Sequence, residues 1–156
     1  MHMPKVGDKV PNFQAVDTEG VVISTEDLFG SIAVIYFYPK DDTPNCTKEA
    51  CDFRDKMAEI DMRGVVVLGI SPDSMKSHEM FADKYKLNFS LLTDESKEIC
   101  KKFDVLKVTE VEGKKVECIE RTTFIVDEKG TIRWMEKPVN VDNHIERVVK
   151  AIDELL

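Results

Sequence analysis

The chain has 156 residues, 42% of them hydrophobic, which suits one globular domain over residues 1–156. The formal net charge of -8 at pH 7 argues against nucleic acid or an anionic membrane surface as the main partner. No apolar run approaches the roughly 20 residues that a membrane helix needs and no signal peptide is evident, so we expect a cytoplasmic protein.

Short apolar segments separated by turn residues predict the N-terminal part of the fold. Residues 13–16 and 21–23 flank the polar turn at residues 17–20, which is typical of a β-hairpin. Residues 26–30 suit a helical turn. Residues 31–38 are almost all apolar, as expected of a central strand that is covered on both faces.

The middle of the chain repeats a strand, helix and strand pattern. A helix over residues 44–64, ending at a glycine, precedes a buried strand at residues 65–70, and this order indicates a parallel crossover. A further helix is predicted at residues 75–85, a short strand at 89–92 and a helix at 95–103.

The C-terminal part favours antiparallel strands and a last helix. Residues 105–119 predict an exposed β excursion, residues 122–126 and 131–135 a hairpin, and residues 142–156 an amphipathic helix. Together these elements predict an α/β, thioredoxin-like fold, in which helices flank a central mixed β-sheet and a β-hairpin lies at the N-terminus.

Residues 36–51 (YFYPKDDTPNCTKEAC) contain the strongest chemical signal. The apolar strand stops at Pro39, Thr43 is a preferred N-cap type, Pro44 suits the first helical position, and Cys46 then falls in the first turn. Unpaired N–H groups and partial positive charge at such a position, helped by a nearby cation, can lower a thiol pKa from about 8.5 to roughly 3.5–7.5. We therefore expect a nucleophilic thiolate at Cys46.

Cys51 lies five residues further along the same predicted helix. In an intact helix the two cysteine Cα atoms would be about 8.6 Å apart, whereas a disulfide needs less than about 7 Å. A bond between them would therefore require the first turns to unwind. An apolar stripe turns Cys46 toward the fold and Cys51 outward. Spacing alone leaves two interpretations of Cys51 equally open: a resolving thiol or an incidental surface thiol.

The pattern P-x-x-x-T-x-x-C over residues 39–46 resembles the active-site motif of peroxiredoxins. The second cysteine at i+5 is similar to that of the Q-type, or bacterioferritin comigratory protein, branch. The resemblance runs from residues 6–13 (VGDKVPNF) through residues 121–127 (RTTFIVD) to the last helix. In one departure, Asn45 stands where the family usually has glycine, and asparagine is a bulkier turn residue.

The resemblance implies a thiol-dependent peroxidase for hydrogen peroxide and organic hydroperoxides. Cys46 would cycle between thiolate and sulfenic acid, and Cys51 would be the intramolecular resolving cysteine, recycled by thioredoxin or a similar reductant. Arg121 would lie against Cys46, Thr43 would hydrogen-bond the peroxide, and Pro39 would shape the loop and shield the thiolate. The resemblance also implies a monomer that needs no cofactor and no metal.

The remaining cysteines and histidines carry weaker signals. Cys100 is interpreted as helix packing and Cys118 as a strand residue, and the cysteine spacings do not suit a zinc site. His2, His78 and His144 lie near no other catalytic signal in the sequence, so a Cys–His hydrolase would lack its base.

Two other functions remain as alternatives. A thiol-disulfide oxidoreductase on the same fold would normally display C-x-x-C, which this chain lacks. A redox-responsive binding or chaperone module would use disulfide formation only to remodel its surface. Peroxide consumption with a thioredoxin system distinguishes the three functions.

Overall fold

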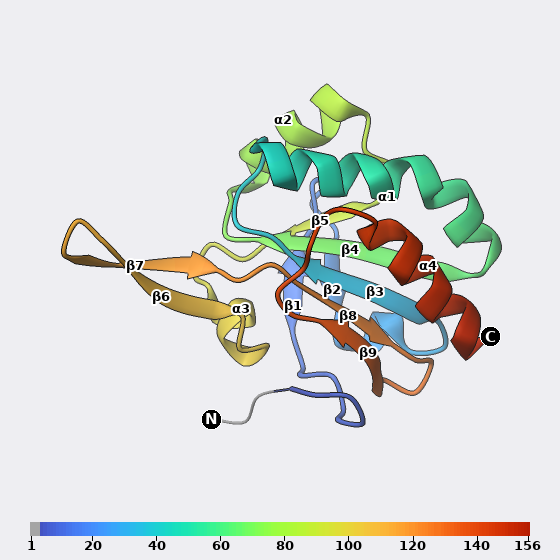
Figure 1. Cartoon of the computed structure of the whole chain (residues 1–156). Coiled ribbons are helices and arrows are strands. Elements are labelled where there is room, and N and C mark those ends of the chain that lie inside the picture. The colour runs from blue at the N-terminus through green and yellow to red at the C-terminus, as the bar shows by residue number, and fades with distance from the viewer. Residues whose placement is uncertain (1–3) are drawn as a thin grey trace.

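A five-stranded mixed sheet of strand order β5-β4-β3-β8-β9 forms the centre of the protein (Figure 1). The parallel strands are β3 (Ile32–Phe37), β4 (Val65–Ser71) and β5 (Ser90–Thr93). On the other side of β3, β8 (Thr122–Val126) and β9 (Ile132–Glu136) pair antiparallel. The thioredoxin-like fold predicted from the sequence is thereby confirmed.

β3 is central because all six of its side chains are apolar or aromatic and all are buried. Alternate residues point to opposite faces of a strand. Ala33, Ile35 and Phe37 accordingly belong to one hydrophobic cluster, whereas Val34 and Tyr36 belong to another. The sheet thus separates two cores, and each core needs its own covering layer.

Three helices cover one face of the sheet: α1 (Pro44–Met62), α2 (Met75–Tyr85) and α4 (His144–Leu155) (Figure 1). The stripe predicted for α1 is buried in this core and consists of Cys46, Ala50, Phe53, Met57 and Ile60. α1 continues to Met62, and Gly64 follows with a left-handed φ of 73°, which suits the glycine expected at the helix end.

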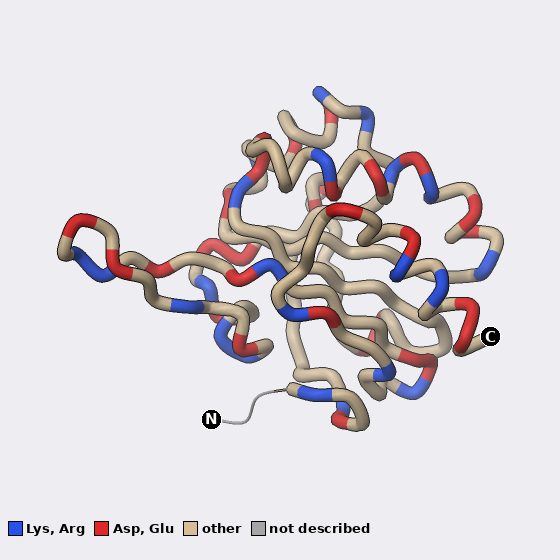
Figure 2. Tube along the Cα trace, in the orientation of Figure 1, with Lys and Arg blue, Asp and Glu red and all other residues tan. Residues whose placement is uncertain are grey.

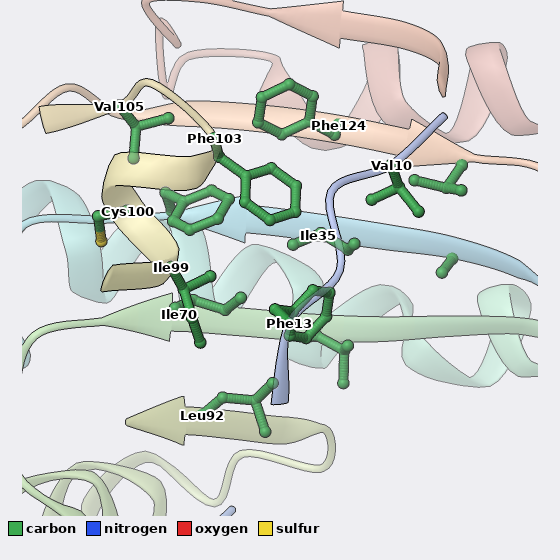
Figure 3. Packing of buried hydrophobic residues seen from close by; sticks show 14 of the residues in the cluster. Val10, Phe13, Ile35, Ile70, Leu92, Ile99, Cys100, Phe103, Val105 and Phe124 are labelled. Carbon is green, nitrogen blue, oxygen red and sulfur yellow. The ribbon is translucent and has the colours of Figure 1, made fainter. Parts of the chain in front are cut away.

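The opposite face is covered by shorter elements. These are the hairpin of β1 (Gln14–Val16) and β2 (Val22–Ser24), the 3-10 helix η1 (Thr25–Leu28) and α3 (Glu98–Lys102). Figure 3 shows Phe13 and Phe103 packed over β3 and β4 in this core, with Cys100 on α3. The predicted N-terminal hairpin is therefore present.

β6 (Leu106–Val111) and β7 (Lys114–Ile119) form a separate antiparallel pair that projects from the body (Figure 1). Most of their side chains are exposed. The predicted exposed β excursion is confirmed.

The helix predicted at residues 95–103 was placed too early, because α3 begins only at Glu98. The Asp94 carboxylate accepts hydrogen bonds from the backbone N–H groups of Ile99 (3.1 Å) and Cys100 (2.8 Å). Lys97, which lies between Asp94 and Ile99 in the chain, has a left-handed φ of 65°. A turn that ends in this residue therefore separates β5 from the helix.

The structure is a computed structural model and describes residues 4–156. Lysine, arginine, aspartate and glutamate are interspersed along the outer elements, and the central strands β3 and β8 carry none (Figure 2). In the described part of the chain, no helix has both the length and the apolar character needed to span a membrane.

Candidate active site

The start of α1 buries a single thiol. Thr43 is the N-cap residue, its carbonyl accepts the N–H of Thr47 (2.8 Å), and Pro44 opens the helix as expected. Cys46 then lies in the first turn with an exposed fraction of only 1%. The helix start directs partial positive charge toward this sulfur.

The Thr43 hydroxyl does not cap the helix but donates to the Lys40 carbonyl at 2.8 Å. It thereby closes the loop between β3 and α1. Since a hydroxyl can donate and accept at once, this oxygen keeps acceptor capacity at the start of α1. Pro39 is half-buried in the same loop and lines a cavity of about 320 Å³ together with Leu106 and Ile119.

Arg121 faces the thiol directly, although the two residues are 75 positions apart. Its Nη2 donates to Cys46 Sγ at 3.2 Å. The sheet register explains the position: Thr122 of β8 pairs with Phe37 of β3, so Arg121 reaches the point where β3 ends and the active-site loop begins. A guanidinium keeps its charge at physiological pH and is suited to holding a thiolate.

Glu49 is a site residue that the sequence analysis missed. Its Oε1 accepts from Arg121 Nη1 at 2.7 Å, and its side chain has no exposed surface. Burial raises the pKa of this carboxyl to about 7, against the opposing effect of Arg121. The sequence signal that could have identified Glu49 is a charged residue at i+3 from Cys46, on the buried face of the helix.

His144 also lies at this site, although it is near no catalytic signal in the sequence. Its Nδ1 is 3.5 Å from Glu49 Oε2, and its Nε2 is 3.0 Å from the Thr123 hydroxyl. Burial lowers the pKa of His144 to about 4. The last helix brings it there from almost a hundred residues away. His2 lies outside the described residues.

A second polar network, centred on Asp41, holds the active-site loop in place. The Asp41 carboxylate accepts from the Tyr38 hydroxyl (2.6 Å) and the Ser77 hydroxyl (2.8 Å) and lies 2.7 Å from His78 Nδ1. The Asp41 N–H donates to Asp73 (2.8 Å). This network ties the loop to α2.

The same network contains carboxylate and imidazole groups, which are common metal ligands. Potential ligand atoms of Asp41, Asp73 and His78 lie within 4.8 Å of one another. The Asp41 carboxylate already has three hydrogen-bonding neighbours, and His78 Nε2 is occupied by the Leu92 carbonyl at 3.1 Å. We therefore interpret the three residues as structural.

Replacing His78 with leucine should lower the free energy of unfolding by about 3 kcal/mol, because it removes one partner of a buried, hydrogen-bonded carboxylate. Urea unfolding of the reduced protein measures the change. Lys84→Ala is the control, since Lys84 joins α2 to the loop through an exposed pair with Asp42 (2.8 Å). Equal losses in the two variants would contradict the role of the buried network.

The other three cysteines have different surroundings. Cys51 is half-buried on α1, and burial raises its pKa. Cys100 is buried on α3 in the opposite core (Figure 3), and burial together with Asp94 raises its pKa strongly. Cys118 is half-buried on β7. The packing role inferred for Cys100 agrees with this position.

Arg121→Ala should slow the oxidation of Cys46 by peroxide about 10²–10³-fold, the loss typical of one positioned donor. Stopped-flow oxidation of the reduced protein measures the effect. The control is Arg133→Ala, since Arg133 pairs with Asp127 on the hairpin of β8 and β9. An unchanged oxidation rate in Arg121→Ala would refute the proposed role of this contact in the reaction.

The site combines a buried thiol at a helix start with a permanent cation, at the carboxyl end of the central strand of a thioredoxin-like sheet. Ligands of open α/β sheets bind at this end. The helix start and the cation together stabilise the thiolate form of this thiol, which is the form that attacks a substrate. Fold and site thus define the class of thiol-based redox enzymes.

Comparisons with known proteins identify the family. Residues 6–135 match the AhpC/TSA family. A putative peroxiredoxin bcp of Coxiella burnetii is 48% identical over 93% of this chain and 96% of that protein. Peroxiredoxin Bcp of Escherichia coli K12 is 38% identical over 99% of both proteins.

Solved structures agree with this family assignment. A structure of the bacterioferritin comigratory protein of Xanthomonas campestris, from work on its alkyl peroxide reduction activity, has a TM-score of 0.88 and 36% identity. The likeness covers 92% of this chain and 91% of that one. The chain belongs to the AhpC/TSA family and is a peroxiredoxin, a thiol-dependent peroxidase.

Proposed function

We propose that Cys46 is the peroxide-reactive residue of this peroxidase. The observation that carries the assignment is the 3.2 Å contact between Arg121 Nη2 and Cys46 Sγ at the start of α1. Arg121 stabilises the thiolate and then the charge that develops on the peroxide oxygens. Thr43 offers its hydroxyl to the bound peroxide, and Pro39 excludes water from the loop.

The cycle consumes one peroxide and two electrons. The Cys46 thiolate attacks the terminal peroxide oxygen, the O–O bond breaks, and the products are a Cys46 sulfenic acid and a leaving group, alkoxide from an organic hydroperoxide or hydroxide from hydrogen peroxide, that takes up a proton. The Cys51 thiol then displaces water from the sulfenic acid to form the Cys46–Cys51 disulfide. An external dithiol reduces this disulfide by exchange and is itself oxidised.

The substrates proposed are hydrogen peroxide and organic hydroperoxides, and the reductant is thioredoxin or a similar protein. Alkyl peroxide reduction by the Xanthomonas campestris relative supports the organic substrates. We further propose that the protein acts as a monomer in the cytoplasm. Apart from the external reductant, the proposed cycle uses only side chains of this chain and needs no organic cofactor.

Stopped-flow mixing of the reduced protein with peroxide tests the assignment, followed by mass-spectrometric mapping of the disulfide. We expect rapid oxidation of Cys46, a Cys46–Cys51 bond, and steady peroxide consumption with a thioredoxin system. Disulfide exchange without peroxide consumption would favour an oxidoreductase, and a single oxidation without turnover would favour a redox-responsive binding module.

A further inference from the structure

The surroundings of Glu49 indicate whether its carboxyl group carries a proton. Glu49 Oε2 is buried and has no hydrogen-bond partner among the described residues. An ionised carboxylate oxygen without a donor is costly in a protein interior. The imidazole of His144 faces this oxygen, with Nδ1 at 3.5 Å, and both side chains are at most 2% exposed.

The contact on the other side of the imidazole is compatible with a hydrogen on Nε2. His144 Nε2 lies 3.0 Å from the Thr123 hydroxyl, which can accept a hydrogen bond. A neutral imidazole with its hydrogen on Nε2 donates to Thr123 and presents the Nδ1 lone pair to Glu49. A proton on Glu49 Oε2 would point at that lone pair, and a small shortening of the 3.5 Å separation would let the carboxylic acid donate to it.

Charge balance favours the same arrangement. Arg121 contacts both Cys46 and Glu49, at 3.2 and 2.7 Å. If both were ionised, two buried anions would share a single guanidinium. A neutral Glu49 leaves the charge of Arg121 to the thiolate.

The neighbouring charges act in both directions on this pair. Glu136 on β9 and Asp52 on α1 raise the pKa of Glu49, and Arg121 lowers it. Arg147 and Arg121 lower the pKa of His144, and Glu136 raises it. Tyr36 of β3 is fully buried, and its own pKa is raised.

Burial is the largest influence on both groups of the pair. With pKa values of about 7 for Glu49 and about 4 for His144, both groups are neutral between these values. In that window the carboxylic acid and the neutral imidazole can form the pairing described above.

We propose that His144 is a positioning residue that accepts a hydrogen bond from protonated Glu49 and so leaves Arg121 to the Cys46 thiolate. The inference rests on the proposed role of Cys46. His144 acts through Glu49 and Arg121 and touches no reacting atom. Above about pH 7 Glu49 ionises and competes for Arg121, so the pH profile of Cys46 oxidation should contain an inflection there that Glu49→Gln removes.

Two spectra of the reduced protein at pH 6 test the pairing without any peroxide. Infrared spectroscopy should show one protonated carboxyl band that Glu49→Gln removes and Glu136→Gln retains. In His144→Leu this band should move to the higher frequency of a carboxyl without an acceptor. ¹⁵N NMR of labelled histidine should show His144 with hydrogen on Nε2 and none on Nδ1, assigned by its loss in His144→Gln.

These measurements distinguish a failure of the Glu49–His144 pairing from a failure of the proposed role of Cys46. An ionised Glu49 at pH 6, a hydrogen on His144 Nδ1, or an unchanged band frequency in His144→Leu would overturn the pairing, whatever Cys46 does. A reduced protein that shows the expected spectra but whose Cys46 is not oxidised by peroxide would instead refute the proposed role of Cys46. The NMR measurement on the wild-type protein stands even if His144→Leu does not fold.

Discussion

Cys46→Ser is expected to abolish peroxidase activity, with a loss on the order of 10³-fold or more, as when an enzyme loses its nucleophile. A serine hydroxyl has no counterpart of the thiolate near neutral pH, so Arg121 and the start of α1 would have no anion to stabilise. Peroxide consumption in the presence of a thioredoxin system and its reductant measures the effect.

Cys100→Ser and Cys118→Ser are the matched controls for this substitution. Neither sulfur lies at a helix start that an arginine faces, since Cys100 packs in the opposite core and Cys118 lies on the projecting hairpin. Both variants should keep nearly full activity once corrected for folded protein. Full turnover by Cys46→Ser would refute the assignment of the reactive residue.

Cys51→Ser should separate the two halves of the cycle. The first oxidation of Cys46 should be unchanged, because its thiol is held by Arg121 and does not depend on Cys51. Disulfide formation and thioredoxin-supported turnover should stop, so the sulfenic acid accumulates. Excess peroxide should then drive Cys46 to the sulfinic acid, which thiols do not reverse. Intact-mass measurements follow each step.

The physical reason for a separate second step is that both cysteines lie on one continuous helix, α1 (Pro44–Met62). Their Cα atoms are about 8.6 Å apart in regular helix geometry, beyond the roughly 7 Å limit for a disulfide. The oxidised wild-type protein should therefore lose helical signal and amide protection around residues 43–53. A Cys46–Cys51 disulfide in a fully protected helix would contradict this unwinding, and a bond to Cys100 or Cys118 would place the resolving thiol elsewhere.

The contacts at the start of α1 show what such unwinding must break. The Arg121 contacts with Cys46 and Glu49 hold the first turns from the sheet side. Just beyond this segment, Arg54 Nη1 donates to the Tyr85 carbonyl (2.7 Å) and so ties the rest of α1 to α2. Oxidation removes the thiolate charge and with it part of the attraction to Arg121, so the sulfenic acid form is the state in which the first turns are held least.

The sequence by itself determined the order of the elements and the position of the reactive thiol. Both depend on local signals: the apolar run at residues 31–38, the Thr43 and Pro44 helix start, and the stripe that buries Cys46. The boundary of α3 was missed, although it is also local, because the side chain of Asp94 competes with the helix for backbone N–H groups.

Only the tertiary structure decided which groups surround that thiol. Arg121 reaches Cys46 through the antiparallel pairing of β3 and β8, and His144 reaches Glu49 because α4 packs beside α1. Sequence periodicity describes neighbours within one element and carries no information on such contacts between distant elements. Burial of Glu49 and His144 then shifts their pKa values in opposite directions, and that desolvation exists only once the sheet and helices have closed around them.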